Sequence, residues 1–519
     1  MKITKLDYSA TGAFSALVTD YLARNPQLDA FYHRFPDIAA FGAQIKEKQL
    51  RPEHRAALCR ELKQQYSTVP SMQPVVRQNL DLLAQPTTYT VTTGHQLNIF
   101  TGPLYFVYKI ITTINLARQL KAAYPEYNFV PVYWMATEDH DFAEVNHFTL
   151  FGKPYAWESG QKGAVGRFNL EDMAPLLAML PDIDPVFKEA YTQHKKLADA
   201  TRAITQVLFG EYGLVALDGD NPELKRIFAP VIRKEIEEQI SHEQVSRVSE
   251  ELAKHYKPQV MSREINLFYL DNGLRERIVL EGGAYKVLNT DLSFSLAEIE
   301  KIIAESPEKF SPNVILRPLY QEMVLPNLAY IGGGAEVSYW FQLQGVFEAF
   351  KVTYPIIMLR NSALYINKPN ANRLQKLQLT ATDIFKDTAT LKKQITAQFE
   401  HEEISLAAEK KQITAVFEQI TKLATAIDGT LTKTVAAEAQ KIQNALEVLE
   451  KKLVKANDAK YETYFNQLTN LKEKLFPDGT LQERIDNLLS YSTNNPQFIS
   501  DLVAAFDPLE GKFTVLEEE

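Results

Sequence analysis

Two extended apolar segments, separated by a long apolar stretch, dominate the hydrophobic pattern of residues 88–146. The first, residues 89–93, is aromatic and β-branched, and the second, residues 129–136, combines valine with aromatic side chains. Residues 99–120 between them have the length and hydrophobicity of a buried helix. A βαβ unit joins parallel strands, so we expect the polar residues that end both strands to meet at one edge of a sheet. In open parallel sheets this edge binds ligands.

The residues before the first strand show apolar positions at helical spacing. Three such segments, 9–23, 36–50 and 53–66, are separated by prolines. We expect these helices to lead into the core and to cover one face of its sheet. Together with the first two strands they form a predicted domain of residues 1–150.

After residue 150 the alternation of strand and helix is lost until about residue 310. Residues 151–309 contain short helices, turns and a predicted hairpin around Asp271-Asn272-Gly273, so we interpret them as a domain inserted between two halves of a sheet. The second half of the core is expected in residues 310–373. Its predicted extended segments are 311–318, 329–331 and 355–359. Its predicted helix is 335–350.

Residues 374–476 contain no proline and are rich in alanine, lysine, glutamate and leucine. Their apolar positions form two heptad-like runs that are out of phase, and a break at Asp428-Gly429-Thr430 explains the change of phase. We therefore expect an antiparallel helical hairpin, followed by a short helical tail, residues 477–519, that packs back on the body. The predicted fold class is α/β, with a Rossmann-like parallel sheet, an inserted domain and a C-terminal α-helical coiled coil.

Composition and charge disfavour several classes of function. The chain has 56 Lys and Arg against 65 Asp and Glu, a net charge of −9, which provides no general basic field for a nucleic acid. The single cysteine, Cys59, forms no internal disulfide, as is typical of a reducing compartment. The N-terminus lacks a signal-peptide core, and the apolar run at 98–117 contains Pro103 and Lys109, so we expect a cytoplasmic protein without a membrane partner.

The turn after the first strand has the pattern Thr-x-Gly-His, which occurs at the first strand-to-helix turn of nucleotidyltransferases and class I aminoacyl-tRNA synthetases. Glycine lets the backbone approach a phosphate, and an imidazole stabilises charge on a transferring group. His95 is therefore a candidate catalytic residue. The surrounding turn and loop supply candidate binding residues: Thr93, Gly94, Gln96, Asn98, Thr101 and Gly102. An ordinary βα connection is the alternative interpretation.

The second strand ends in an acidic cluster, Glu138-Asp139-His140-Asp141. Three carboxylates in four residues repel one another unless they bind protons, cations or a ligand amine, so Glu138, Asp139, His140 and Asp141 are candidate catalytic residues that act on an amine. Asn146 and His147 follow as candidate binding residues. The sequence lacks the histidine or cysteine spacing of a tight zinc site, and no dedicated metal is predicted. A solvated acidic turn is the alternative.

Apolar segments in the second half of the core also end in glycine or charged residues. Gly332, Gly333 and Gly334, with Glu336 in the helix that follows, form a candidate phosphate cradle. A guanidinium presents two aligned donors to a carboxylate, which makes three further residues candidates for substrate binding: Arg317, Arg360 and Asn361 beside it. A tight turn and structural ion pairs are the alternatives.

These segments together resemble the bacillithiol biosynthesis cysteine-adding enzymes, a family of cysteine ligases. The resemblance extends over the full length of the chain and includes the helical hairpin. It depends on the following segments: Thr93-Gly94-His95-Gln96, Phe100-Thr101-Gly102-Pro103-Leu104-Tyr105, Glu138-Asp139-His140-Asp141-Phe142 with Asn146-His147, Arg263-Glu264-Ile265-Asn266-Leu267-Phe268-Tyr269-Leu270, Ser311-Pro312-Asn313 with Arg317-Pro318, and Phe513-Thr514-Val515-Leu516.

The resemblance implies a core related to class I synthetases and nucleotidyltransferases, a connective-peptide insertion, and a coiled coil associated with a homodimer. It also implies the last step of bacillithiol synthesis, in which the cysteine carboxyl is joined to the amine of glucosaminyl malate. Amide formation from a free carboxylate requires activation, so a nucleotide, ATP or ADP, is the expected cofactor. Two other functions remain open: a nucleotidyltransferase acting on another small acceptor, and a non-catalytic coiled-coil assembly protein.

Overall fold

The computed structural model describes residues 1–69, 72–180, 183–399 and 405–519. The chain divides into two compact units. The larger unit comprises Ile3–Leu364 and Thr480–Thr514. The smaller unit comprises Met1–Lys2, Tyr365–Gly479 and Val515–Glu519.

The larger unit contains a five-stranded parallel sheet in the order β13-β12-β2-β3-β6. Its strands are β2 (Thr88–His95), β3 (Asn128–Met135), β6 (Val215–Asp218), β12 (Asn327–Gly332) and β13 (Ile356–Leu359). Every neighbouring pair is parallel, so all five carboxyl ends lie at one edge. The predicted Rossmann-like core is confirmed.

The helix α5 (Tyr105–Ala123) connects β2 to β3 and packs on both strands. Every residue from Phe106 to Ala117 in this helix is buried. It begins later than the predicted residue 99, because Phe100, Thr101 and Gly102 have left-handed backbone angles that interrupt the helix. In the described ranges, no helix combines the length and hydrophobicity that a membrane span requires.

The hydrophobic pattern did not predict β6, which lies within the range assigned to the insertion. This strand has four residues, too few for a periodic signal, and it pairs with β3 so that Val132 lies opposite Val215. The parallel core therefore continues into residues 151–309, of which 181–182 lie outside the described residues. Gly219 and Asp220 consequently follow a core strand at the carboxyl edge.

The described residues before β2 include a short strand and four α-helices: β1 (Lys2–Leu6), α1 (Ala16–Leu22), α2 (Ile38–Glu47), α3 (Pro52–Tyr66) and α4 (Pro74–Leu82). The strand was not predicted. The first predicted helix, 9–23, is shortened because a 3-10 turn ends at Gly12, where φ is 65°. Since α2 contacts both α5 and β12, the predicted helical cover is observed.

A second, antiparallel sheet has the order β10-β9-β8-β7-β11. Its strands are β7 (Leu267–Asp271), β8 (Leu274–Glu281), β9 (Ala284–Val287), β10 (Ser293–Phe294) and β11 (Phe310–Pro312). The predicted hairpin around 271–273 is confirmed as β7-β8. The segment 311–318 does not resume the parallel core as predicted, because β11 pairs with β7 and α13 (Arg317–Val324) begins with a favourable Pro318 in its first turn.

The predicted helix 335–350 is divided into α14 (Gly334–Trp340) and α15 (Gln344–Phe350). The buried Gln342 lies between them and accepts hydrogen bonds from the backbone N–H groups of Gln259 and Val260. This contact explains the interruption. The remaining elements of the larger unit up to residue 305 are β4 (His147–Leu150), β5 (Lys153–Ala156), α6 (Phe142–Val145), α7 (Ala174–Ala178), α8 (Pro185–Gln193), α9 (Leu197–Phe209), α10 (Pro222–Glu238), α11 (Ile240–Leu252) and α12 (Leu296–Glu305).

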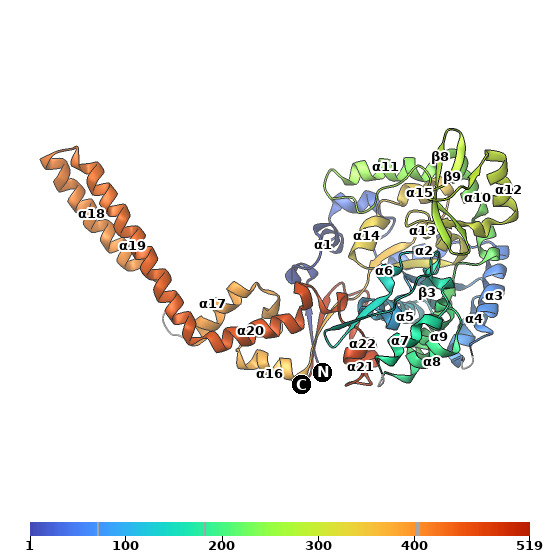
Figure 1. The fold of residues 1–519 in the computed structure, drawn as a ribbon, viewed down its shortest axis with the longest axis horizontal. Helices are drawn as coiled ribbons and strands as arrows, with labels where there is room; N and C mark the ends of the chain where they lie inside the picture. The colour runs from blue at the N-terminus through green and yellow to red at the C-terminus, as the bar shows by residue number, and fades with distance from the viewer. Residues whose placement is uncertain (70–71, 181–182, 400–404) are drawn as a thin grey trace. The chain divides into compact units, whose positions relative to one another are not determined.

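The smaller unit contains the predicted antiparallel hairpin, formed by α18 (Ala407–Ile427) and α19 (Leu431–Lys460), which lie side by side (Figure 1). The Asp428 carboxylate accepts hydrogen bonds from the N–H and hydroxyl of Thr430, which places the turn at the predicted break. The other helices of this unit are α16 (Lys368–Lys376), α17 (Thr388–Phe399) and α20 (Glu462–Leu475). Residues 400–404 of the predicted helical region lie outside the described residues.

The C-terminal segment contains the short helices α21 (Leu489–Ser492) and α22 (Phe498–Ala505). It does not remain helical to its end as predicted. Its last element is the strand β15 (Phe513–Glu517), in a sheet of order β1-β15-β14, where β14 is Ala363–Ile366. Aromatic and β-branched residues in β15 favour an extended backbone.

A fully buried ion pair connects the residue after α2 to α13. Lys48 Nζ lies 3.1 Å from Glu322 Oε2, and the two side chains are 2% and 0% exposed. Asn327 and Gln321 donate to the other oxygen of Glu322. Removing one partner of such a pair leaves an uncompensated buried charge, at a cost of about 3–5 kcal/mol.

Candidate functional site

A cavity of about 720 Å³ lies at the carboxyl edge of the parallel sheet. All five strands contribute residues at or just after their ends: Gly94 and His95 from β2, Thr137, Glu138 and Asp139 after β3, Gly219 and Asp220 after β6, Gly333 and Gly334 after β12, and Arg360 after β13. The antiparallel sheet provides further lining residues, among them Phe268, Arg275 and Arg277. A volume of this size suits a small-molecule site, for which roughly 300–1,000 Å³ is usual.

The His95 imidazole is packed against aromatic rings. It stacks on Phe106 with ring centroids 5.1 Å apart and lies edge-on to Tyr105 at 5.4 Å. Its Nε2 is buried, and no described residue forms a hydrogen bond with it. Burial, together with the charges of Lys109 and Arg360, lowers the pKa of His95 well below its ordinary value. The ring is therefore neutral at pH 7. It can form a hydrogen bond with a ligand, but it does not act as a cationic catalyst.

Gly94 allows two side chains to approach the end of β2. A Cβ atom at this position would lie 3.1 Å from the Tyr330 hydroxyl and 3.2 Å from Arg317 Nη1. Arg317 itself donates to the Tyr339 hydroxyl at 3.2 Å and to Gln321 Oε1 at 3.1 Å. Because neutral groups hold this guanidinium, its positive charge remains available to an anionic ligand.

Glu336 fixes the glycine turn after β12. Its carboxylate pairs with Lys109 and accepts hydrogen bonds from the Tyr330 hydroxyl at 2.7 Å and the Gly333 N–H at 2.8 Å. Burial opposes ionisation, but Lys109 and these donors keep the pKa of Glu336 below its usual value. Lys109 also donates to the Gly94 carbonyl at 2.9 Å, so one network connects the ends of β2 and β12.

Glu138 is held by a buried lysine. Lys225, on α10, donates to Glu138 Oε1 and to the Phe310 carbonyl, and its side chain is 0% exposed. Burial raises the pKa of Glu138 to about 7, with Lys225 opposing and Asp220 adding to the rise. Near neutral pH this carboxyl group can therefore both take up and release a proton.

Asp139, the adjacent carboxylate, has the opposite character. It accepts hydrogen bonds from the His140 backbone N–H at 2.7 Å and from Gln96 Nε2 at 2.7 Å, and Arg275 Nη1 lies 3.9 Å away. Burial alone would raise the pKa of Asp139, but the His140 imidazole, whose Nδ1 lies 3.7 Å from Asp139 Oδ1, together with the Arg275 charge and Gln96, holds it well below its usual range. Asp139 is thus a permanent anion beside the titratable Glu138.

Further acidic residues lie at and after the end of β6, where no functional residue was predicted. Asp220 receives two hydrogen bonds from Arg167, at 2.6 and 2.7 Å. Asp218 accepts hydrogen bonds from the Thr137 hydroxyl and the Asp220 N–H. Burial and the neighbouring Asp220 raise the pKa of Asp218 to about 6. The turn Asp218-Gly219-Asp220 was visible in the sequence, but only pairing of β6 with β3 places it beside Glu138.

Arg360 reaches the cavity from the end of β13. Its Nη2 lies 2.7 Å from Glu483 Oε1, and its Nη1 donates to the Ser362 hydroxyl at 2.8 Å. Its Nε is buried and forms no hydrogen bond with any described residue. One donor of this guanidinium therefore remains for a ligand near Gly333, whose ideal Cβ would lie 3.8 Å from it.

Basic side chains outnumber acidic ones in the cavity lining, although the whole chain carries a net charge of −9. Seven lining residues are basic: Lys109, Arg263, Arg275, Arg277, Arg317, Arg360 and Arg484. Four are acidic: Glu138, Asp139, Asp220 and Glu336. Within the described residues, Arg263, Arg277, Arg317 and Arg484 form no ion pair, so the cavity favours anionic ligands.

Half of the predicted site residues line the cavity: Gly94, His95, Gln96, Glu138, Asp139, Arg317, Gly333, Gly334, Glu336 and Arg360. The others lie outside its lining: Thr93, Asn98, Thr101, Gly102, His140, Asp141, Asn146, His147, Gly332 and Asn361. The Asp141 carboxylate caps α6, and Asn487 donates to the carbonyls of Phe100 and Gly102, which fixes the loop that was expected to wrap a ligand. No cluster of three metal-ligating side chains occurs in the part of the chain that the structure describes.

Several residues that shape the site were missed by sequence reasoning. Lys109, Lys225, Arg275 and Glu483 pair with groups in or beside the cavity, yet each lies in a helix, strand or turn with no motif. A charged residue inside an otherwise apolar helix, such as Lys109 in α5, was the one available signal.

Comparison with known proteins identifies both parts of the chain. Residues 1–361 match the family model "Bacillithiol biosynthesis BshC, N-terminal Rossmann-like domain", and residues 363–518 match "Bacillithiol biosynthesis BshC, C-terminal coiled-coil domain". A protein of Flavobacterium psychrophilum named "Putative cysteine ligase BshC" is 42% identical over 99% of both chains. Proteins of the same name from Cytophaga hutchinsonii and Bacillus anthracis are 40% and 29% identical, over 98% and 92% of this chain and 97% and 93% of their own. The chain therefore belongs to the bacillithiol biosynthesis BshC family.

Proposed function

We propose that this protein is a cysteine ligase of bacillithiol biosynthesis that joins the cysteine carboxyl to the amine of glucosaminyl malate. The observation that carries the proposal is the cavity itself, where a titratable carboxyl group and a permanent carboxylate lie beside guanidinium groups that form no ion pair with any described residue. The two carboxyl groups are suited to bind an amine that must lose a proton. The guanidinium groups are suited to bind the carboxylates of cysteine and of the malyl group. The relatives' name supports the same reaction class. We place the reaction in the cytoplasm, where thiols stay reduced.

Glu138 and Asp139 have different roles toward the substrate amine. Asp139 is ionised throughout the physiological range and attracts the substrate as an ammonium ion. Glu138, with a pKa of about 7, accepts the proton that the nitrogen must lose before or during its attack on the cysteine carbonyl carbon.

The malyl carboxylates fit the arginines of the antiparallel sheet. Arg275 and Arg277 are two residues apart in β8 and so project from the same face, separated by about 7 Å along the strand. Arg275 contacts Asp139, whereas Arg277 and Arg263 form no ion pair with described residues. A sugar whose amine lies at Glu138 and Asp139 would extend its malyl group along this wall.

The ends of β2, β12 and β13 carry groups suited to an anion, in contrast to the acidic residues that bind the amine. His95 Nε2 and Arg360 Nε are buried without a described partner, and Arg484 lies nearby in electrostatic contact with Tyr105. We assign the cysteine carboxylate to His95 and Arg360. ATP would supply the activation that a free carboxylate needs, and Arg484 and the Gly333 turn are the residues suited to its phosphates.

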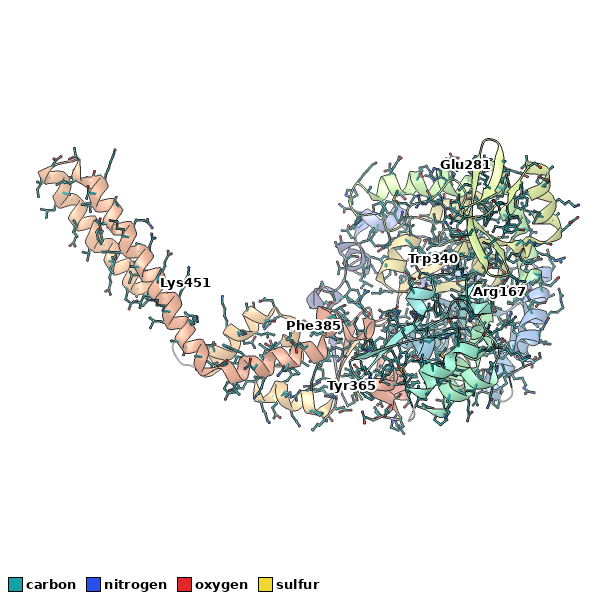
Figure 2. All side chains as sticks on the ribbon, in the orientation of Figure 1. Arg167, Glu281, Trp340, Tyr365, Phe385 and Lys451 are labelled. Atoms are coloured by element: carbon teal, nitrogen blue, oxygen red, sulfur yellow. The ribbon has the colours of Figure 1, made fainter. Side chains whose placement is uncertain are left out.

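We further propose that the helical hairpin forms a homodimer. Val416, Ile420, Leu423 and Ile427 of α18 are 40–72% exposed and repeat at spacings of four, three and four residues, on a stripe beside the contact with α19. Ile442, Leu449 and Leu453 of α19 are exposed at 39–47%. Figure 2 shows side chains projecting along the length of both helices. A second hairpin would cover these apolar rows as a four-helix bundle.

The first prediction concerns the reaction and its base. Purified protein incubated with cysteine, glucosaminyl malate and ATP is expected to yield bacillithiol, detected by mass spectrometry, with kcat/KM falling as the pH drops below about 7 because Glu138 becomes protonated. Glu138→Gln should lower kcat by at least about a hundredfold. Asp141→Asn is the control, since it keeps the cap of α6 outside the cavity. A nucleotidylated sugar in place of bacillithiol would contradict the proposal and favour a nucleotidyltransferase.

The second prediction concerns the malyl group. Arg277→Gln should raise the KM for glucosaminyl malate by about tenfold or more, because one charge-assisted contact is worth about 1.5–3 kcal/mol, and should leave the KM for cysteine unchanged. An acceptor without the malyl group, such as a methyl glucosaminide, should react equally with both proteins. The exposed Arg226 on α10 provides the matched control, Arg226→Gln. An unchanged KM in Arg277→Gln would place the malyl group elsewhere.

The third prediction concerns assembly. Leu423→Glu places a charge in the exposed apolar row, so size-exclusion chromatography with light scattering should show the mass of one chain instead of two. Lys451→Glu, a charge change on the opposite side of α19 from Leu449 and Leu453 (Lys451 is labelled in Figure 2), should remain dimeric. Equal masses for the wild type and Leu423→Glu would argue against dimerisation through the hairpin.

A further inference from the structure

Lys225 is a buried charge directly behind the acidic part of the cavity. Its side chain is 0% exposed, and its ammonium group contacts Glu138 Oε1, the Phe310 carbonyl at 2.6 Å and, at 5.6 Å, the ring of Tyr320. Taking an ammonium ion out of water costs several kcal/mol unless it is paired. The lysine is therefore fixed by its partners, one on the segment after β3 and one on β11.

The Lys225 contact uses only one oxygen of Glu138. No described residue donates a hydrogen bond to Oε2, while the residue lines the cavity and its side chain is 13% exposed. Lys225 thus holds Oε1 of Glu138, and Oε2 is available to a ligand.

We propose that Lys225 is a positioning residue for the ligase reaction, which holds Glu138 as a carboxylate and directs its second oxygen toward the substrate amine. This inference rests on the proposed function of the cavity. In the step it supports, the amine nitrogen bonds to the cysteine carbonyl carbon, the bond from that carbon to the activated oxygen breaks, and the nitrogen's proton passes to Glu138 Oε2. The leaving group departs with the electron pair of the broken bond.

The charges around Glu138 explain why the lysine is needed. Burial favours the protonated form of Glu138, as does the charge of Asp220 after β6. Arg275 on β8 opposes them, but it also contacts Asp139, and Arg167 is engaged by Asp220. Tyr320 on α13 supplies a ring and no charge to Lys225. Without Lys225, the protonation equilibrium of Glu138 at neutral pH shifts toward the neutral acid, which cannot accept a proton.

The Lys48–Glu322 pair provides a matched control. It is also a buried lysine–glutamate pair, with side chains 2% and 0% exposed, and neither residue lines the cavity. Lys48→Met and Lys225→Met therefore remove the same charge from comparably buried places. Only the second change should alter the titration of Glu138.

The first experiment follows that titration without relying on catalysis. A water-soluble carbodiimide with glycinamide modifies protonated carboxyl groups, and peptide mass spectrometry reports the labelling of Glu138 at each pH. Half-maximal protection is expected near pH 7 in the wild type and in Lys48→Met. In Lys225→Met it should move upward by about one unit or more. An unchanged midpoint in Lys225→Met would overturn the inference, whether or not the wild type makes bacillithiol.

The second experiment separates positioning from structural damage. Lys225→Met should lose about fivefold in kcat/KM at pH 7 and approach the wild type at pH 9, where Glu138 ionises without help. Because the unpaired Glu138 is stable as the neutral acid, this variant should fold at pH 6 and become less stable as the pH rises. An equal loss of activity at both pH values, or failure to fold at pH 6, would show a structural role and contradict the proposal.

Discussion

The parallel pairing of five strands is the constraint on which the site depends. Because β13, β12, β2, β3 and β6 all run in the same direction, residues up to 266 positions apart in the sequence, from Gly94 to Arg360, end at one edge of the sheet. The antiparallel sheet supplies Arg275 and Arg277 to the same cavity. Chemistry that is scattered along the chain is thereby collected in about 720 Å³.

Charge compensation then gives each end of the cavity its character. Each of four acids forms an ion pair with a different cation: Glu138 with Lys225, Asp139 with Arg275, Asp220 with Arg167 and Glu336 with Lys109. Two neighbouring carboxyl groups consequently titrate far apart: burial raises the pKa of Glu138 to about 7, whereas the His140 side chain, Arg275 and Gln96 hold the pKa of Asp139 well below its usual range. Such a separation of neighbouring carboxyl groups is how proteins assign acid–base and electrostatic roles. Arginines without an ion pair in the described chain provide the remaining positive charge.

The sequence predicted the parts of the fold that have long periodic signals. The βαβ unit around α5, the β7-β8 hairpin and the break at 428–430 in the hairpin of α18 and α19 agree with the structure. Four-residue β6 was too short to predict, and β11 joined a different sheet from the one expected, because strand pairing is a long-range choice that local pattern does not specify.

The candidate site was predictable for residues at or shortly after the end of a core strand, such as His95, Glu138, Asp139 and Arg360. It was not predictable where local hydrogen bonds turn a neighbouring side chain or loop away from the cavity. The Asp141 carboxylate turns back to cap α6, and Asn487, 385 residues further along the chain than Gly102, fixes the loop after β2. The partners Lys225 and Glu483 carry no motif, since their importance comes from burial beside one acid or base.

A crystal structure of the protein soaked with glucosaminyl malate would test the position of the amine most directly. The sugar amine is expected within about 3 Å of Glu138 Oε2. The malyl carboxylates should lie on Arg277 and Arg263. A sugar bound with its amine away from Glu138, or bound outside this cavity, would contradict the central claim that the carboxyl edge of the parallel sheet is where the amide bond is made.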